Sequence, residues 1–273
     1  MSGQLYLLPC PISEAPALDA LPASTVETAR RIDHFLVEAA RTARATLKAM
    51  GHPKPIAELD IVEIGHDPAP ELISEWLQPV LDGADAAVLS ESGCPGVADP
   101  GAQIAARAHE LGICVVPLTG PSSILLTLMA SGLDGQRFRF SGYLPKHDAE
   151  RRAAILAAEK ASRASETQLF IETPYRNTAL LDALLETLAP DTRLTVAIDV
   201  TGQNESIRTL TAAAWKAIPK AMRTLPKLPT VFAFLAKPGN RAPRYAPECA
   251  GGKRAHTAPS SNCLLYTSDA ADD

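Results

Sequence analysis

Two segments rich in glycine, proline and serine have the composition expected of a ligand-binding loop. The longer one, Leu89 to Gly101, holds three glycines and two prolines in the nine residues that begin at Gly93. Glycine permits positive φ and lets a ligand approach the backbone closely, whereas proline stiffens a loop before anything binds. A simple turn needs fewer such residues. The segment therefore predicts a rigid binding loop.

The second segment, Pro117 to Ser123, follows an apolar run and precedes another. Ser122 or Ser123 could cap a helix there, and the free N–H groups at the helix start could bind a carboxylate or a ring nitrogen. Taken alone, an ordinary capped helix explains the segment equally well. The presence of two such segments favours a binding role.

Other common site chemistries lack their motifs. The first apolar run is followed by Pro9-Cys10-Pro11-Ile12-Ser13, not by G-x-G-x-x-G, and no G-x-x-x-x-G-K-[ST] occurs. Hydride transfer and nucleotide hydrolysis are therefore poorly supported. The five cysteines are scattered, with no C-x-x-C or Cys/His zinc spacing, so we expect neither a disulfide framework nor a metal site.

Composition is ordinary for a globular protein. The chain has 273 residues, which suggests about two domains. It is 46% apolar and 21% charged, with a net charge of −5. The longest nearly uncharged apolar run, Ile124 to Leu133, is much shorter than the roughly 20 residues that span a bilayer. The start of the chain has no basic signal region. We therefore expect a soluble, cytoplasmic protein with no membrane contact.

Positive charge is concentrated late in the chain. No Asp or Glu occurs from Ser206 to Pro247, a stretch that carries eight Lys and Arg residues. Such a stretch can bind nucleic acid. The commoner alternative is a solvated face whose charge is balanced by acids elsewhere in the fold.

Short apolar runs alternate with amphipathic segments. In the first half, we expect strands at Leu5–Leu8, 59–64, Ala86–Leu89 and 113–116, and helices at 70–81 and 100–111. Ser24 to Met50 fits either one helix or a strand, 32–37, followed by a helix. In the second half, we expect strands at 138–141, 169–171, 194–200 and 231–235, and helices at 148–164 and 177–188. This rhythm predicts an α/β fold with mostly parallel sheets.

The rhythm restarts after the Gly-Pro turn near residue 120, which predicts two domains, 1–117 and 118–239. Residues 240–273 lack an apolar period, so we expect a disordered tail there. The ending from Cys263 onward does not look like native protein, and the tail is left out of the fold prediction.

The order and spacing of these segments resemble the tetrapyrrole methylase superfamily, and within it the bacterial ribosomal-RNA small-subunit methyltransferase I branch, which methylates a cytidine ribose oxygen. Segments that match run from residue 5 to about 235: Ser90-Glu91-Ser92-Gly93-Cys94-Pro95, Asp99-Pro100-Gly101, Gly120-Pro121-Ser122-Ser123, Ala130-Ser131-Gly132-Leu133, Gly142-Tyr143-Leu144-Pro145-Lys146 and Glu172-Thr173-Pro174-Tyr175-Arg176-Asn177.

The resemblance implies two unequal α/β domains, a homodimer, and S-adenosyl-L-methionine bound in the cleft between the domains. It also favours a strand that ends at Val37, with Glu38 at its tip. By motif position, the cofactor would contact Ile12, Gly93, Cys94, Pro95, Val97, Ser123, Ile124, Phe170, Ile171, Ile198 and Thr230.

Three motifs depart from the family pattern. G-T-P-I-G-N becomes Pro9-Cys10-Pro11-Ile12-Ser13-Glu14, E-D-T-R becomes Glu38-Ala39-Ala40-Arg41, and E-L-T-K becomes Asp199-Val200-Thr201-Gly202. The cofactor loops are thus better preserved than the polar positions that would serve the acceptor. The resemblance therefore supports the methyl donor more strongly than it supports ribosomal RNA as the acceptor.

Methyl transfer to a hydroxyl requires alignment, exclusion of water and a group that takes the proton. The candidates are Glu38, Glu91, Asp99, Glu172 and His66. Each could equally be a helix cap, an ion-pair partner or a turn residue, so we assign no catalytic residue. Three hypotheses follow: an RNA ribose methyltransferase, a methyltransferase for a tetrapyrrole or another small acceptor, and a degenerate paralogue that binds the cofactor without turnover.

Overall fold

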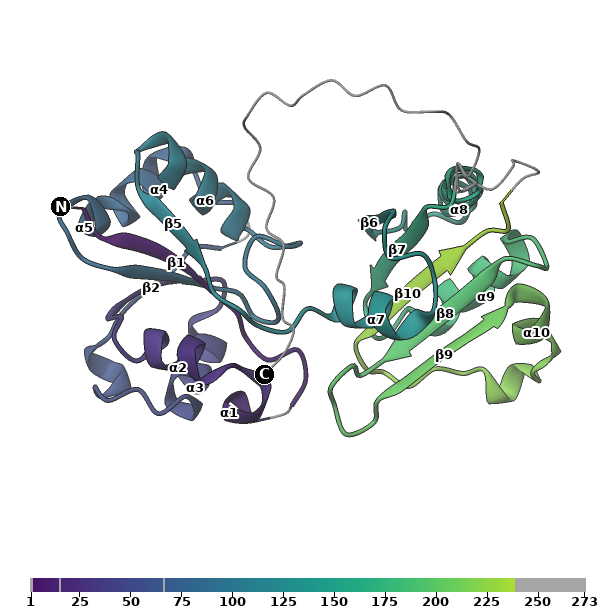
Figure 1. Cartoon of the computed structure of the whole chain (residues 1–273), viewed down its shortest axis with the longest axis horizontal. Coiled ribbons are helices and arrows are strands. Elements are labelled where there is room, and N and C mark those ends of the chain that lie inside the picture. Colours follow the sequence, from purple (N-terminus) through teal and green to yellow (C-terminus); the bar gives the residue numbers. More distant parts are fainter. Residues whose placement is uncertain (1, 15, 66, 239–273) are drawn as a thin grey trace, which may run out of the picture. The chain divides into compact units, whose positions relative to one another are not determined.

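Two five-stranded sheets form the framework of the described residues, which are 2–14, 16–65 and 67–238 of this computed structural model (Figure 1). These residues fall within one contiguous unit, Met1–Gly239. The predicted boundary between two domains near residue 117 lies between the two sheets and stays a prediction.

The first sheet is wholly parallel, with the strand order β3-β2-β4-β1-β5. Its strands are β1 (Gln4–Leu8), β2 (His34–Val37), β3 (Asp60–Glu63), β4 (Ala86–Leu89) and β5 (Cys114–Pro117). Every residue of β2 and β4 is buried, because both strands have a neighbour on each side and helices on both faces. Apolar runs without alternation are the expected sequence of such strands.

Helices cover both faces of this sheet (Figure 1). One core cluster contains Leu8, Phe35 and Leu89 with residues of α2 and α3, and the other contains Leu5, Leu36 and Val88 with residues of α4, α5 and α6. Successive side chains of a strand point to opposite faces, which explains the division. The helices are α1 (Ala17–Ala20), α2 (Ala23–Ala29), α3 (Ala40–Ala49), α4 (Pro70–Trp76), α5 (Gln78–Leu81) and α6 (Gly101–Glu110), with a 3₁₀ turn, η1 (Ile56–Glu58).

The second sheet is mixed, with the order β6-β7-β10-β8-β9. Only β6 and β7 are parallel; the other pairs are antiparallel. Its strands are β6 (Phe138–Tyr143), β7 (Thr167–Glu172), β8 (Arg193–Ile198), β9 (Ser206–Thr211) and β10 (Thr230–Leu235). The helices of this half are α7 (Ser123–Ser131), α8 (Asp148–Ser162), α9 (Asn177–Thr187) and α10 (Ala212–Ala217), with a 3₁₀ turn, η2 (Lys220–Met222).

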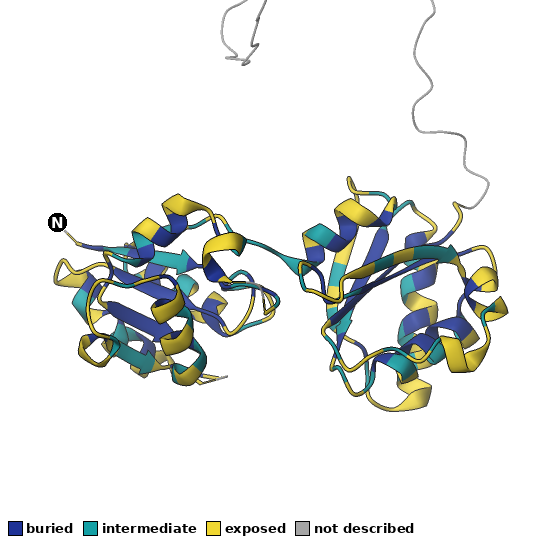
Figure 2. Cartoon of the chain, turned by 90° about the horizontal axis from the view of Figure 1, so that it is seen from below, coloured by how far each residue is buried: buried dark blue, intermediate teal, exposed yellow. Residues whose placement is uncertain are grey.

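The two faces of the second sheet have different partners. One face packs on α8, α9 and α10 through a cluster that includes Phe170, Phe232 and Phe234. The opposite face packs on α7 and on Ile12 of the first half, through Leu169 and Ala197 among others. In Figure 2 the strands are dark blue at the centre of each sheet, while the outer sides of the helices are exposed.

The observed elements confirm most of the predicted ones. Of the two readings of the stretch from 24 to 50, the structure confirms the one that the resemblance favoured, because β2 separates α2 from α3. The expected helix over 70–81 is broken into α4 and α5, since Pro79 has no N–H to donate to the preceding turn. Strand β9 and helix α10 were not predicted.

The chain leaves the neighbouring strands β1 and β4 in opposite directions. From β1 it runs to β2 on one side, and from β4 it runs to β5 on the other. Loops that diverge in this way leave a crevice at the carboxyl ends of the strands, where open α/β sheets bind ligands. Both segments singled out in the sequence, Leu89 to Gly101 and Pro117 to Ser123, lie at this edge.

Three sequence-based predictions fall partly or wholly outside the description of the fold. His66, the tail 240–273 and the end of the basic stretch lie outside the described residues. None of the helices within the described ranges is both long and apolar enough to cross a bilayer.

Gly120 is predicted to be essential for the packing of the loop after β5 against the loop after β1. A Cβ at Gly120 would stand 2.2 Å from Cβ of Pro9, whereas a Cβ at Gly135 would have no heavy atom within 4 Å. We expect Gly120→Ala to lower the free energy of unfolding by about 1–3 kcal/mol, the usual cost of overpacking, and Gly135→Ala to leave it nearly unchanged. Urea denaturation measures both, and equal effects would contradict the packing described.

Candidate functional site

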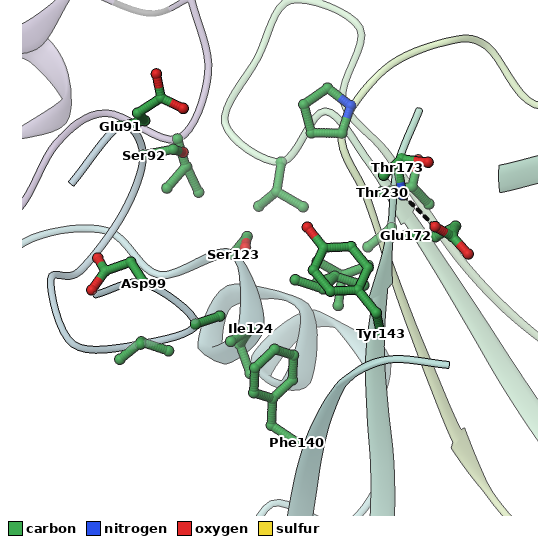
Figure 3. A pocket seen from close by; sticks show the side chains of 18 of the residues that line it. Glu91, Ser92, Asp99, Ser123, Ile124, Phe140, Tyr143, Glu172, Thr173 and Thr230 are labelled. Carbon is green, nitrogen blue, oxygen red and sulfur yellow. Dashed lines mark hydrogen bonds between the residues drawn. The ribbon is translucent and has the colours of Figure 1, made fainter. Parts of the chain in front are cut away.

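A cavity of about 360 Å³ opens at the carboxyl edge of the first sheet and against the α7 face of the second. This volume is within the range of small-molecule sites. Its lining comes from the loops after β1, β2 and β4, from the start of α7, and from β6, β7, β8, β10 and the residues next to these strands. Figure 3 shows the side chains that surround it.

The loops after β1 and β4 are joined by a reciprocal pair of backbone hydrogen bonds. The N–H of Cys10 donates to the carbonyl of Gly93 at 2.9 Å, and the N–H of Gly93 donates to the carbonyl of Cys10 at 3.2 Å. Gly93 has φ of 75°, which explains why glycine is needed there. The Cys94 thiol donates to the carbonyl of Pro121 at 3.4 Å and so ties in the loop after β5. Three loops therefore form one wall.

The two cysteines of this wall are structural. Burial raises the pKa of Cys10 to about 12, and burial also raises the pKa of Cys94. Both thiols are therefore protonated at neutral pH. A protonated thiol is a weak nucleophile, so neither cysteine is suited to covalent catalysis.

Asp99 holds the turn of the long loop and also faces the cavity. Its Oδ1 accepts hydrogen bonds from the N–H groups of Gly96, at 2.6 Å, and Gly101, at 2.8 Å. Its Oδ2 is buried and has no hydrogen-bond partner among the described residues. Burial raises the pKa of Asp99, and the hydrogen bonds from Gly96, Gly101 and the Ser90 side chain partly offset that rise. The carboxylate of Asp99 thus holds the turn of its own loop beside the cavity.

The opposite wall is an apolar surface with a polar edge. Ile171, Ala197 and Val231 line the cavity from β7, β8 and β10, and Phe140 and Tyr143 line it from β6. Figure 3 shows the ring of Tyr143 between the start of α7, at Ser123, and the strand that ends at Glu172. Such a wall suits a flat, largely apolar group with a few polar atoms.

Glu172 and Thr230 form the polar edge, and both are held in place. Glu172 Oε1 accepts from the N–H of Thr173 at 2.7 Å, and its Oε2 pairs with Nη2 of Arg176 at 2.9 Å. Thr230 donates its hydroxyl to the carbonyl of Leu228 at 3.0 Å and accepts from Nδ2 of Asn177 at 2.9 Å. The edge of the cavity is therefore rigid.

Charge in the cavity has one sign. Its described lining includes four carboxylates and no Lys, Arg or His. Low-dielectric walls with charge of one sign favour a ligand of the opposite sign. The cavity is therefore suited to a cation. The four carboxylates are those of Glu38, Glu91, Asp99 and Glu172.

These four are also the carboxylates that the sequence proposed as proton acceptors, so the structure brings them to one cavity. The N–H of Glu91 donates to Oε2 of Glu38 at 3.3 Å, and Glu91 Oε1 accepts from the hydroxyl of Thr42 at 3.4 Å. Nothing in this geometry selects one carboxylate as the base.

The predicted cofactor residues separate into three groups. Six line the cavity: Ile12, Val97, Ser123, Ile124, Ile171 and Thr230. Gly93, Cys94 and Pro95 belong to the loop wall behind that lining. Phe170 and Ile198 pack in the cluster under α8, α9 and α10, on the other face of the sheet. For the residues outside the lining, a contact with the cofactor stays a prediction.

The alternation of side chains along a strand explains why Phe170 and Ile198 do not line the cavity. Because neighbours in a strand face opposite sides, Phe170 cannot share a face with Ile171, nor Ile198 with Ala197. The sequence analysis missed Ala197, Phe140, Tyr143 and Val231. Alternation along β8 would have replaced Ile198 with its neighbour Ala197, but no sequence signal identifies the residues of β6.

The divergent motif after β8 has a compact structure of its own. Asp199 has φ of 48° and accepts from the N–H of Asn204 at 2.9 Å. A Cβ at Gly202 would stand 2.2 Å from the Asp199 carboxyl carbon. A lysine at 202, as in the family motif, would therefore displace Asp199. The Thr201 hydroxyl lies 3.0 Å from that of Ser13, which links this turn to the loop after β1.

A second cavity of about 360 Å³ shares four lining residues with the first: Ile12, Glu91, Ser92 and Pro229. Asp199 and Asn204 line it from the turn after β8. The shared residues make the two cavities neighbours. Within the described residues, no group of three or more His, Cys, Asp or Glu could hold a metal ion.

The raised pKa of Asp99 predicts a specific pH dependence. Its contribution to the free energy of unfolding is fully present below the unfolded pKa, about 3.9, and is lost as pH rises through the higher folded pKa. Asp99→Asn keeps an acceptor for the two N–H groups but cannot titrate. We expect the free energy of unfolding of the variant, minus that of the wild type, to rise with pH from about 3.9 up to the folded pKa of Asp99 and to stay constant above it. Urea denaturation at a series of pH values measures it; a constant difference would show that Asp99 ionises normally.

Comparison with known proteins agrees with this arrangement. A family model described as Tetrapyrrole (Corrin/Porphyrin) Methylases matches residues 17–215. A uroporphyrin-III-C-methyltransferase from Thermus thermophilus is similar in structure, with a TM-score of 0.51 and 18% identity over 86% of this chain and 93% of that one. A diphthine synthase is similar too, with a TM-score of 0.60 and 17% identity over 86% and 90% of the two chains. At these identities the similarity shows the fold.

Curated relatives include two proteins named ribosomal RNA small subunit methyltransferase I. The one from Bacillus subtilis is 30% identical over 203 residues, which are 74% of this chain and 65% of that protein. The one from Vibrio cholerae is 30% identical over 205 residues, which are 75% and 67%. The chain thus spans about two thirds of the length of these relatives.

The family model covers well over half of the chain, and the fold is that of the similar solved structures. The chain belongs to the tetrapyrrole methylase family.

Proposed function

We propose that this protein is an S-adenosyl-L-methionine-dependent methyltransferase that methylates a ribose 2′-oxygen of small-subunit ribosomal RNA. The observation that carries the proposal is the cavity, whose described lining offers four carboxylates and no cationic side chain in a chain of this family. The relatives named ribosomal RNA small subunit methyltransferase I support the choice of acceptor.

The residues present fit the cofactor. S-adenosyl-L-methionine carries a sulfonium and an ammonium against one carboxylate, so its net charge is positive and matches the acidic lining. We assign its binding to the six lining residues predicted from the sequence, backed by the loop of Gly93, Cys94 and Pro95.

When bound, the cofactor supplies a methyl group on a sulfonium, which is open to in-line displacement by an oxygen nucleophile. The residues of this chain must position the acceptor hydroxyl, exclude water and take the proton. The joined loops after β1, β4 and β5 provide a fixed wall for positioning. A carboxylate among Glu38, Glu91, Asp99 and Glu172 takes the proton, and the choice among them is left to mutagenesis.

We also propose a homodimer of two-domain subunits, acting in the cytoplasm, where ribosomes are available. The alternatives are a small acceptor, such as a tetrapyrrole, and a paralogue without turnover.

The direct test is methyl transfer from radiolabelled S-adenosyl-L-methionine to purified small ribosomal subunits that lack ribose methylation. We expect label in the ribosomal RNA, in a dinucleotide that resists alkaline hydrolysis because its 2′-hydroxyl is blocked. Label in alkali-sensitive nucleotides would refute ribose as the acceptor. No label despite cofactor binding would favour a small acceptor or a paralogue without turnover.

A second prediction tests the cavity as the cofactor site. Ser123 lines the cavity, and Met129, on the same helix, is 77% exposed. Ser123→Phe would fill part of the cavity, so we expect S-adenosyl-L-methionine to bind at least about tenfold more weakly, a loss of roughly 1.4 kcal/mol. Met129→Phe, the matched control, should bind normally. Isothermal titration calorimetry measures both, and unchanged binding by Ser123→Phe would place the cofactor elsewhere.

A further inference from the structure

An exposed aromatic ring stands beside the cavity without a role in the fold. The side chain of Tyr175 is 80% exposed, which makes it the most exposed large hydrophobic residue of the described chain. The residues just before it, Thr173 and Pro174, line the cavity. Tyrosine is enriched at interfaces because one end of its ring is apolar and the other polar, so an exposed ring next to the cavity lining is placed to contact a ligand.

A cation covers one face of this ring. Nζ of Lys227 lies 5.1 Å from the ring centroid of Tyr175, within the range of a cation–π interaction. The two residues that follow Lys227, Leu228 and Pro229, line the second cavity, and Pro229 lines both. The Tyr175–Lys227 pair therefore flanks the opening where the two cavities meet.

Buried polar contacts hold the two segments together. Asn177 is fully buried, and its Nδ2 donates to the carbonyl of Leu228 at 2.8 Å. The N–H of Leu225 donates to the hydroxyl of Thr178 at 3.0 Å. These bonds attach the segment before β10 to the start of α9, so the ring and the ammonium are brought together by the framework and not by chance contact at the surface.

Charge changes sign between the cavity and this edge. The described lining of the cavity is acidic, whereas Lys227 lies on a segment beside it and Arg176, already paired with Glu172, lies on another. A cation-selective interior would repel a phosphate, while cations outside it would attract one. An acceptor with an anionic backbone would therefore be bound at the edge while its reacting atom reaches inward.

We propose that Tyr175 and Lys227 form a nucleotide platform, on which one base of a single-stranded RNA acceptor stacks while a neighbouring phosphate pairs with Lys227. The base occupies the ring face that Lys227 leaves open. Stacking on exposed aromatic rings beside cationic side chains is how proteins commonly bind single-stranded RNA. This inference rests on the proposed function, because it needs an RNA acceptor.

Binding of a fluorescein-labelled, cytidine-rich single-stranded RNA, followed by fluorescence anisotropy, tests the platform. We expect Tyr175→Ala to weaken binding about tenfold or more and Tyr175→Phe, which keeps the ring, to bind nearly as the wild type. Lys227→Ala should reduce the slope of log affinity against log salt by about 0.7, the value for one phosphate contact on a single strand.

Arg208→Ala is the matched control. Arg208 also lies over an aromatic ring, at 5.5 Å from that of Trp215, but on the edge strand β9. We expect its salt slope to stay that of the wild type. Binding of S-adenosyl-L-methionine, measured by calorimetry, should be unchanged in all four variants, since none of these residues lines the cavity.

The outcomes separate the two proposals. If the wild type binds the RNA and Tyr175→Ala binds equally well, or Lys227→Ala and Arg208→Ala behave alike, the platform is refuted and the RNA acceptor stands. If the wild type does not bind the RNA at all, the platform is refuted, while methyl transfer to small ribosomal subunits alone decides the RNA acceptor. If Tyr175→Ala instead changes only the oligomeric state, measured by light scattering, the ring serves contact with a second copy of the chain.

Discussion

The pairing of Cys10 with Gly93 is the constraint on which the site depends. β1 and β4 are neighbours whose chains diverge after their last residues, and two reciprocal backbone hydrogen bonds carry their pairing into the loops. With the bond from Cys94 to Pro121, three loops that would otherwise move separately become one surface. A binding wall held by backbone groups costs little conformational entropy when a ligand arrives. The proline- and glycine-rich sequence of these loops serves that rigidity.

Charge gives this rigid surface its selectivity. The cavity collects carboxylates from loops of the first sheet and from the end of β7, and Asp99 also uses one of its oxygens to hold its own loop. The cations of the second half stand outside, as with Lys227 over Tyr175. One molecule can thus accept a cationic donor inside and an anionic acceptor at the edge. The basic stretch noted in the sequence supplies part of that edge.

The sequence predicts what depends on neighbouring residues and misses what depends on distant ones. Buried strands such as Ala86–Leu89 are evident because every position is apolar, and the loop at Gly93 is evident from its glycine and proline content. Strand β9 escapes notice because it is an edge strand with a half-exposed, polar sequence. The hydrogen bond of Asn177 to Leu228 joins residues 51 positions apart, so no local sequence pattern predicts it. Motif position alone also does not reveal that Phe170 lies on the face of the sheet that packs under α8, α9 and α10, which strand alternation explains.

The most direct test of this account is a crystal structure of the protein soaked with S-adenosylhomocysteine, the demethylated product of the donor. We expect density for the whole of S-adenosylhomocysteine in the cavity, against Ile12 and Ser123 on one wall and Ile171 on the other. Its sulfur should face open space toward the carboxylates. Density at another place, or a cavity filled by its own side chains at saturating ligand, would contradict the central claim.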